Sequence, residues 1–456
     1  MHHIEQWINI LNDWIWGTPL IVLLIVVGIL ITVRTRGVQF RHLFYAHKLA
    51  FVRHDDSAEG DISHFQALMT ALAATIGIGS IAGVATAVAS GGLGALFWMW
   101  VAAFFGMATK YGEAILAIKY RVVDENGEMC GGPMYYLERG LKSKGLAVLF
   151  AVLAAITAIG TGNMVQANSV SSAVQDLFGI DPLWSGIVLM IFTGGALLGG
   201  IKSIGKIAGV LVPAMAIFYI GGGLLIIFLK IQYVPDAFWL IVKSAFSGQA
   251  AVGGFLGATV MQAVQLGVSR SIFSSEAGLG SSPIAAAAAR TDTPGRQALV
   301  SMSSVFITTG IVCTITGLVI AITGVLGDTN AAGQVLDGSA LALHAFDAVL
   351  PAGGLIVTIA LIPFAYSTIL GWAYYGEKCV EYLFGVKMVK PYRIIFTLVV
   401  IPGAMLSLDI VWGFANMMNG LMALPNLIGL FLLSGVIARE TTAFDTIVKH
   451  ERIKNS

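Results

Sequence analysis

Residues 73–83 read Ala73-Ala74-Thr75-Ile76-Gly77-Ile78-Gly79-Ser80-Ile81-Ala82-Gly83, in the middle of an apolar segment that spans about residues 64–89. A segment of this length is typical of a membrane-spanning helix. The glycines and hydroxyl side chains at its centre would break that helix at bilayer depth, because glycine weakens a helix. Non-helical backbone is tolerated there only where protein or a watery cavity covers it. We therefore expect a broken helix of the kind that forms transporter binding sites.

The composition of the 456-residue chain is that of a polytopic membrane protein. Hydrophobic residues make up 57% of it and charged residues 11%, whereas soluble domains carry roughly 25% charged residues. The net charge of +1 indicates no polyelectrolyte partner such as nucleic acid. Cys130, Cys313 and Cys379 match no metal spacing and no disulfide framework. The first apolar run, residues 17–33, is expected to remain as an anchor.

Eleven membrane-spanning helices are predicted, so the chain is expected to be all-α and to form one transmembrane domain over residues 1–456. Two amphipathic segments, residues 34–59 and 235–247, are expected to lie in the membrane interface. Residues 121–144 and 328–349 are expected to form polar loops. The predicted spans are residues 19–33, 64–89, 95–120, 146–177, 183–201, 205–228, 253–283, 297–325, 355–375, 394–412 and 417–437.

The basic residues predict how these spans are oriented in the membrane. Nearly all of the 26 Lys and Arg residues fall on one side when the loops are numbered alternately. Only Lys230 and Lys243 fall on the other side, and Lys110 and Arg270 fall within spans. Since positive loops stay in the cytoplasm, we expect a multi-pass protein of the cell membrane with its N-terminus outside and its C-terminus in the cytoplasm.

A second glycine-interrupted segment, Gly278-Leu279-Gly280, lies at the end of the seventh predicted span. Spans 2 and 7 are five spans apart and cross the membrane in opposite directions. This predicts an inverted five-plus-five repeat, formed by spans 2–6 (about residues 61–230) and 7–11 (about residues 250–440), after one extra N-terminal span. The alternative is that the 54 glycines serve close helix packing.

Four motifs resemble those of the alanine/glycine:cation symporters, the sodium:alanine symporter family. The resemblance covers nearly the whole chain. It implies a LeuT-like fold and uptake of a small neutral amino acid, alanine or glycine, coupled to Na⁺ or sometimes H⁺, with no other cofactor. The motifs are residues 91–107, which include Phe97-Trp98-Met99-Trp100, then Gly131-Gly132-Pro133-Met134-Tyr135-Tyr136, residues 160–168, and Ser274-Ser275-Glu276-Ala277-Gly278-Leu279-Gly280.

The first break is the predicted site of a substrate carboxylate. The half-helix that follows Gly77 and Gly79 presents free N–H groups and the positive end of the helix dipole. Glycine has no side chain, so the backbone can approach the ligand closely. We expect the Thr75 hydroxyl to assist. The alternative is that both glycines only allow close packing.

An ammonium group needs acceptors, because unmet polar groups are costly in apolar surroundings. Asn163 and Gln166 lie three residues apart on one face of span 4, with Asn168 nearby. The alternative for all three amides is hydrogen bonding between helices.

The second break and span 9 supply the remaining predicted substrate contacts. Carbonyls freed around residues 271–274, including that of Ser274, are further acceptors for the ammonium group. Phe273 would cap a small side chain, although ordinary packing explains it equally well. Tyr366 and Trp372 in span 9 are weaker candidates, since large aromatic side chains narrow a pocket.

A cation requires hard oxygen ligands. Span 9 places the adjacent hydroxyls of Ser367 and Thr368 deep in an apolar helix. The resemblance to LeuT-like folds pairs such hydroxyls with carbonyls just before the first break. It implies a Na⁺ site made by these hydroxyls and the carbonyls of Ala73, Ile76 and Phe364. The alternative is that both hydroxyls bond back to their own helix.

The ionisable residues inside spans, Lys110, Glu113, Arg270 and Glu276, are expected to form static ion pairs, with a gate formed by Arg270 and Glu276 as the alternative. The expected cation site contains no carboxylate, which favours Na⁺ over H⁺. The sequence therefore predicts a secondary active symporter in a lipid bilayer. H⁺ coupling and a passive channel are the alternatives. An enzyme is disfavoured, because no nucleophile–base pair or phosphate loop stands out.

Overall fold

The computed structural model describes residues 7, 10–12, 14–51, 59–247, 259–330, 333–406 and 408–455. The regular secondary structure of this part of the chain is helical except for one two-stranded antiparallel sheet, in which β1 (Val122–Val123) pairs with β2 (Met129–Cys130). The all-helical architecture expected from the sequence is confirmed.

Seven helices of the described chain are long and apolar enough to cross a membrane, or eight if one bent pair counts as a single span. On α12, Val210, Ile217 and Phe228 are 75%, 72% and 73% exposed, a surface that suits lipid rather than water. The protein is therefore a multi-pass membrane protein. The seven are α7 (Gly94–Lys119); α9 (Lys144–Thr157), η3 (Ala158–Met164) and α10 (Val165–Phe178); α12 (Gly200–Leu229); α16 (Pro294–Val305), η5 (Phe306–Cys313) and α17 (Thr314–Thr323); α19 (Gly354–Phe384); η6 (Val386–Met388) and α20 (Val389–Met405); and α21 (Leu408–Leu432).

The predicted total of eleven also requires three further helices to span. They are the short apolar helices α2 (Thr18–Arg34) and α11 (Pro182–Leu197), and α14 (Val260–Ser275). The exact count therefore stays a prediction. The start predicted for span 7, near Gly253, lies outside the described residues, as do residues 52–58 of the first interface segment.

The second span is broken where its glycines predict. α5 (His64–Thr75) begins with a capping box, in which Ser63 and Gln66 bond each other's backbone, and ends at the first break. Gly77 is extended, with φ −113° and ψ −161°, and η1 (Ile78–Ser80) follows it. α6 (Ala82–Gly91) completes the span, and the two halves are bent by 67°.

Two predicted boundaries are wrong. Helix α19 continues nine residues beyond residue 375 and ends at Phe384, before Gly385, whose φ of 81° suits a glycine C-cap. Helix α20 ends at Met405 because Leu406 is extended, so Trp412 belongs to α21 rather than to the span before it. Hydropathy detects apolar runs but not these backbone turns.

Shorter helices lie between the spans. α3 (Val38–Arg41) and α4 (Leu43–Phe51) occupy the first predicted interface segment, and α13 (Val234–Ser247) the second. α18 (Gly338–Asp347) lies within the predicted polar loop of residues 328–349. The others are α8 (Pro133–Tyr135), η2 (Tyr136–Gly140), η4 (Ile231–Tyr233), α15 (Pro283–Ala287) and α22 (Ser434–Asn455).

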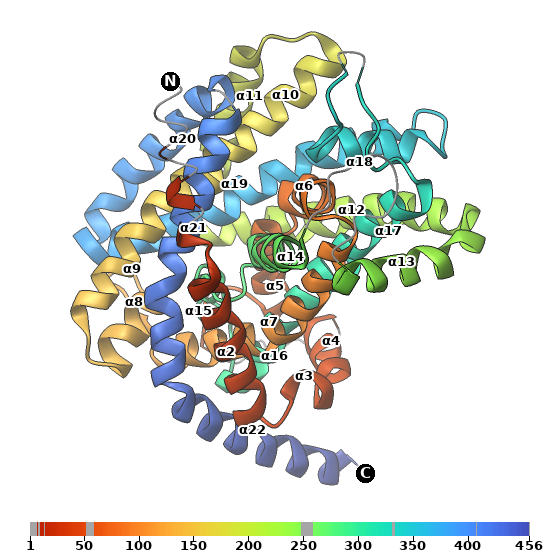
Figure 1. Ribbon diagram of the computed structural model, residues 1–456. Helices are drawn as coiled ribbons and strands as arrows, with labels where there is room; N and C mark the ends of the chain where they lie inside the picture. The colour runs from red at the N-terminus through yellow and green to blue at the C-terminus, as the bar shows by residue number, and fades with distance from the viewer. Residues whose placement is uncertain are drawn as a thin grey trace.

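The two broken segments meet in the middle of the bundle. Figure 1 shows α14 near its centre, with α5 and α7 beside it, while α22 extends across its base. α12 and α19 pack against α5. The π-helical turns η3 and η5 lie against α19 and η1 respectively. Such turns often mark functional sites, because they interrupt the regular backbone bonds.

Candidate substrate and cation site

Four of the five predicted cation ligands lie together where α19 passes the end of α5. The hydroxyls of Ser367 and Thr368 donate to the carbonyl of Ala73, at 3.2 and 3.0 Å. They also donate to the carbonyl of Phe364, at 2.9 Å each. All four residues are buried. No hydrogen bond in the described chain joins the carbonyl of Ile76, the fifth predicted ligand, to this group.

Gly77 brings the broken turn directly against these hydroxyls. A Cβ at Gly77 would lie 2.5 Å from Thr368 Oγ1 and 3.5 Å from Gln166 Oε1, so only glycine fits. The Gln166 amide nitrogen donates to the Thr161 carbonyl at 3.1 Å, whereas Oε1 is buried without a partner among the described residues. A free acceptor therefore faces the break, as expected for an ammonium contact.

An aromatic layer covers Gly79. A Cβ there would lie 2.8 Å from the Phe273 ring. Phe273 stacks on Trp412, with ring centroids 5.5 Å apart and planes at 24°. The Arg270 guanidinium lies 6.0 Å from the Phe273 ring and 5.8 Å from the Trp412 ring, a cation–π arrangement. The sequence analysis missed Trp412, because a lone aromatic at a span end resembles a lipid-facing one.

Ser274, near the end of α14, contacts the first break directly. Its hydroxyl lies 2.9 Å from that of Ser80 and 3.2 Å from the Cys313 sulfur. Thr316 donates to the Ser80 carbonyl at 3.0 Å. The sequence analysis assigned no role to Ser80, Cys313 or Thr316, because single small polar residues in apolar helices carry no periodic signal.

Two of the predicted amides bond neighbouring helices instead of facing the break. The Asn163 amide nitrogen donates to the Phe396 carbonyl at 2.6 Å, and that of Asn168 donates to the Leu406 carbonyl at 2.7 Å. Both bonds join span 4 to α20. This is the interhelical alternative weighed for these residues.

The remaining candidates, Thr75, Tyr366 and Trp372, make contacts within their own helix or with neighbouring helices. The Thr75 hydroxyl donates to the Ala71 carbonyl of its own helix at 2.9 Å. The Tyr366 hydroxyl donates to a carbonyl of α11 at 3.0 Å, and Tyr366 is only half-buried. Trp372 is buried against η3, where a Cβ at Gly162 would collide with it at 2.1 Å.

The second break is also present, but its charges are not paired as expected. Residues 276–282 separate α14 from α15, with positive φ at Glu276, Gly278 and Gly280. No ion pair joins Lys110 to Glu113 or Arg270 to Glu276 in the described chain. The expectation of static pairs is wrong, because backbone groups and aromatic rings take their place.

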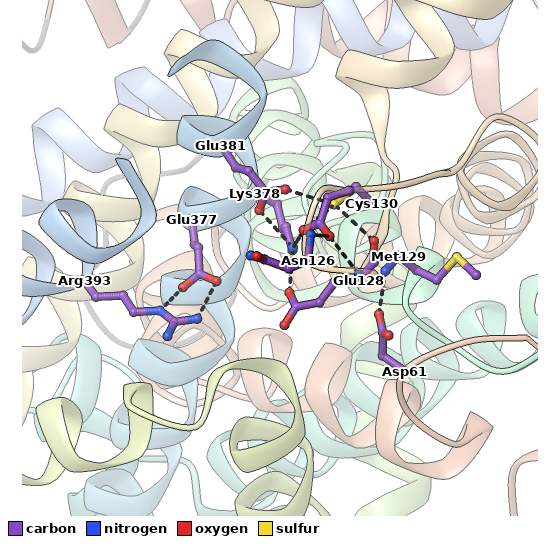
Figure 2. A network of polar contacts seen from close by, with 10 residues as sticks. Asp61, Asn126, Glu128, Met129, Cys130, Glu377, Lys378, Glu381 and Arg393 are labelled. Carbon is purple, nitrogen blue, oxygen red and sulfur yellow. Dashed lines mark hydrogen bonds and ion pairs between the residues drawn. The ribbon is translucent and has the colours of Figure 1, made fainter. Parts of the chain in front are cut away.

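A polar network joins α19 to the β1–β2 hairpin near the start of α5 (Figure 2). The buried Lys378 ammonium lies 2.9 Å from carboxylate oxygens of Glu128 and Glu381 and 3.5 Å from Asp124. The Cys130 thiol donates to Glu381 at 3.2 Å. This network fastens α19 to the β1–β2 hairpin.

Asp61 connects the same hairpin to the segment that leads into α5. Its carboxylate accepts from the backbone nitrogen of Met129 at 2.8 Å, as Figure 2 shows. Burial raises the pKa of Asp61 above its usual value, and the Met129 bond opposes that shift. Burial likewise raises the pKa of the Cys130 thiol, so this cysteine is an unreactive thiol at neutral pH.

The fold is that of known membrane transporters. The solved structure of MhsT in complex with L-phenylalanine superposes with a TM-score of 0.55 at 12% identity, over 84% of this chain and 99% of that one. A solved structure of the Eremococcus coleocola manganese transporter gives 0.53 at 16% identity, over 87% of this chain and 77% of that one. With its interrupted helices, the chain therefore has a LeuT-like fold.

The family follows from the sequence comparisons. The model of the sodium:alanine symporter family matches residues 1–456, and the chain belongs to this family. It is 58% identical over 449 residues to the sodium/alanine symporter AgcS of Methanococcus maripaludis, which covers 97% of this chain and 98% of that relative. The resemblance inferred from the four motifs is confirmed, and the family is one of transporters rather than enzymes.

Proposed function

We propose that this protein is a secondary active symporter that couples uptake of a small neutral amino acid, alanine or glycine, to Na⁺. Family membership supports the class of transport. The observation that carries the proposal is the meeting of the Ser367 and Thr368 hydroxyls with the Ala73 carbonyl at the first break.

The cation would bind between α5 and α19. The carbonyls of Ala73 and Phe364 and the hydroxyls of Ser367 and Thr368 are hard oxygen donors. When Na⁺ binds, the hydroxyls turn their hydrogens away and offer lone pairs, so that one ion replaces four hydrogen bonds. We assign Ile76 to the fifth position, as the sequence implies. Na⁺ would therefore hold the two helices together.

The amino acid would bind on the other side of the same turn. Its carboxylate would meet the free N–H groups of Gly77 and Gly79 at the start of the second half-helix. Gln166 Oε1 is the acceptor for the ammonium, since it is buried, unpartnered and close to Gly77. Phe273 covers the small side chain from above Gly79. Ser274 would line the substrate site. Thr75, Asn163, Asn168, Tyr366 and Trp372 would hold the helices around that site in place.

Coupling would follow from the shared turn. Na⁺ fixes the carbonyl end of α5, and the amino acid fixes the N–H groups that come directly after it. Each ligand pre-orders backbone that the other needs, so each raises the affinity for the other by the same factor. We further propose that spans 2–6 and 7–11 are the inverted repeats and that the N-terminus is outside, as the basic residues predict.

Uptake into proteoliposomes tests this function. With purified protein and an inward Na⁺ gradient, radiolabelled alanine should accumulate above its external concentration, and a K⁺ gradient should not drive accumulation. Accumulation driven equally by a pH gradient without Na⁺ would support H⁺ coupling instead. Flux that only equalises the two concentrations would indicate a channel.

A further inference from the structure

The second break contains charges that transport by the first break does not use. Lys110, Glu113 and Glu276 are 0%, 0% and 1% exposed, and they meet where α7 passes residues 275–281. Both carboxylates interact electrostatically with the Lys110 ammonium. Buried ionisable groups at membrane depth are costly, and their presence calls for a functional explanation.

One oxygen of the Glu113 carboxylate is surrounded by donors, whereas its other oxygen, Oε2, is buried without a partner in the described chain. One oxygen, Oε1, accepts from the backbone nitrogens of Gly278 and Gly280 at 3.1 Å each, and from the Asn426 amide at 2.7 Å. The Tyr136 hydroxyl donates to the Asn426 oxygen, which orients that amide toward Glu113. Three donors on one oxygen stabilise the ionised carboxylate, so Glu113 carries a negative charge.

Lys110 has one direct contact. Its ammonium donates to the Ser275 carbonyl at 2.7 Å, at the last residue of α14. A cation at this position favours the negative end of the helix dipole. Lys110 therefore carries one positive charge, which Glu113 and Glu276 share.

Glu276 has fewer donors than Glu113. Its Oε2 accepts from the Ser281 hydroxyl at 2.7 Å, and its buried Oε1 makes no hydrogen bond of good geometry in the described chain, although the Trp372 side chain interacts with this carboxylate. Its φ of 56° is uncommon for a residue other than glycine, so the break itself aims this side chain. From α19, Tyr375 interacts electrostatically with Glu276; it is a neutral phenol whose hydroxyl also lacks a partner in the described chain.

With both carboxylates ionised, the three residues would carry a net charge of −1 in a site shielded from water. An uncompensated buried charge is strongly destabilising, and a group in this position takes up a proton. We propose that Glu276 is a proton-binding site, separate from the Na⁺ site, and that its proton brings the charge of Lys110, Glu113 and Glu276 to zero. The Ser281 hydroxyl donates to Glu276 Oε2 in the structure, and it would turn to accept the proton when Glu276 is protonated.

This site would make the second break sensitive to pH. Deprotonation of Glu276 adds one negative charge beside the backbone of residues 276–280, where Glu113 already stands. Repulsion between the two carboxylates would then favour rearrangement of the break. The effect on uptake rests on the transport function proposed above, whereas the protonation itself does not.

Infrared difference spectroscopy of the purified, lipid-embedded protein tests the protonation directly. The wild type minus Glu276→Gln spectrum should show the carbonyl band of a buried, protonated carboxylic acid, and Glu125→Gln, at an exposed loop position, should leave it unchanged. Ser281→Ala should shift the band, because it removes the hydroxyl bonded to Glu276. Absence of the band would overturn the proposal.

Two further outcomes decide the assignment. A band that shifts in Asn426→Ala but not in Ser281→Ala would place the proton on Glu113 and overturn the assignment to Glu276. A band abolished when Na⁺ replaces K⁺ in the buffer would mean that Na⁺ balances the group instead, which also overturns it. Both measurements use folded protein that retains Glu276, so they stand even if Glu276→Gln fails to fold.

The uptake measurement then tests the consequence. Alanine uptake at a fixed Na⁺ gradient should depend on pH in the wild type and lose that dependence in Glu276→Gln. An unchanged pH profile in the variant would overturn the role in transport. If the wild type takes up no alanine at all, the proposed function fails while the infrared result still decides the proton site.

Discussion

The Thr368 hydroxyl donates to the carbonyl oxygen of Ala73 at 3.0 Å, although the two residues are 295 positions apart in the chain. This bond joins the end of α5 to the middle of α19 at the point where α5 stops being helical. It can form only because the Ala73 carbonyl has lost its own helical partner at the break. The break therefore frees the Ala73 carbonyl, which the Thr368 hydroxyl of α19 then binds.

Replacement of Thr368 by Val should weaken coupling to Na⁺. Valine has nearly the shape of threonine but offers no oxygen, and a hydrogen bond or ligand to a charged group is worth about 1.5–3 kcal/mol. We expect the Na⁺ concentration for half-maximal alanine uptake to rise at least about tenfold. Thr368→Ser keeps the oxygen and should stay close to the wild type. An unchanged Na⁺ dependence in Thr368→Val would remove Thr368 from the ion site.

Gly79→Val should abolish alanine binding. Even a Cβ at this position would lie 2.8 Å from the Phe273 ring, so valine must push the ring off the break. Gly221→Val is the matched control, because a Cβ at Gly221 has open space around it. Direct binding of labelled alanine to purified protein in Na⁺ measures both. Normal affinity in Gly79→Val would contradict the carboxylate assignment.

Gln166 and Asn168 should respond differently to alanine substitution. Gln166 has a free acceptor at the break, so Gln166→Ala should reduce alanine affinity about tenfold or more with little change in melting temperature. Asn168 bonds the end of α20, so Asn168→Ala should lower the melting temperature and leave affinity nearly unchanged. Equal effects of the two variants on affinity would show that Gln166 has no special place in the site.

Lys378→Met should destabilise the protein strongly. It removes the cation shared by Asp124, Glu128 and Glu381, and loss of one partner from a buried pair costs about 3–5 kcal/mol. Thermal unfolding in detergent measures the change. Arg41→Ala is the control: it breaks a partly exposed pair with Asp445, and such pairs contribute about 0–1 kcal/mol. A stable Lys378→Met variant would mean that the network does not fasten α19 to the β1–β2 hairpin.

Asp61 should make stability depend on pH. Its pKa is raised in the folded protein by burial, so the folded state holds the proton more tightly than the unfolded chain does. The stability from this group is therefore present below the unfolded pKa and is lost as pH rises through the folded pKa. Asp61→Asn keeps an acceptor for Met129 and removes the charge. The melting temperature of Asp61→Asn should increase relative to that of the wild type as pH rises over this range. A difference in melting temperature that does not change with pH would contradict this prediction.

The broken helices were predictable from the chain alone. Glycines at bilayer depth weaken a helix whatever surrounds them, and both predicted breaks are present at Gly77 and at Gly278–Gly280. The hydroxyls of Ser367 and Thr368 became candidates only through the resemblance to LeuT-like folds, since Ser and Thr in a helix otherwise bond back to their own backbone. Long apolar runs determined most of the spans, because the bilayer demands about 20 apolar residues from each.

Only the tertiary structure decided which polar groups face the break. Asn163, Gln166 and Asn168 are equivalent by composition, yet only the carbonyl oxygen of Gln166 is aimed at Gly77, while the other two amides bond α20. Trp412 and the partners of Glu113 and Glu276 are equally invisible in the sequence. A side chain's role here depends on which carbonyl or ring a neighbouring helix presents, and that follows from helix packing between residues hundreds of positions apart.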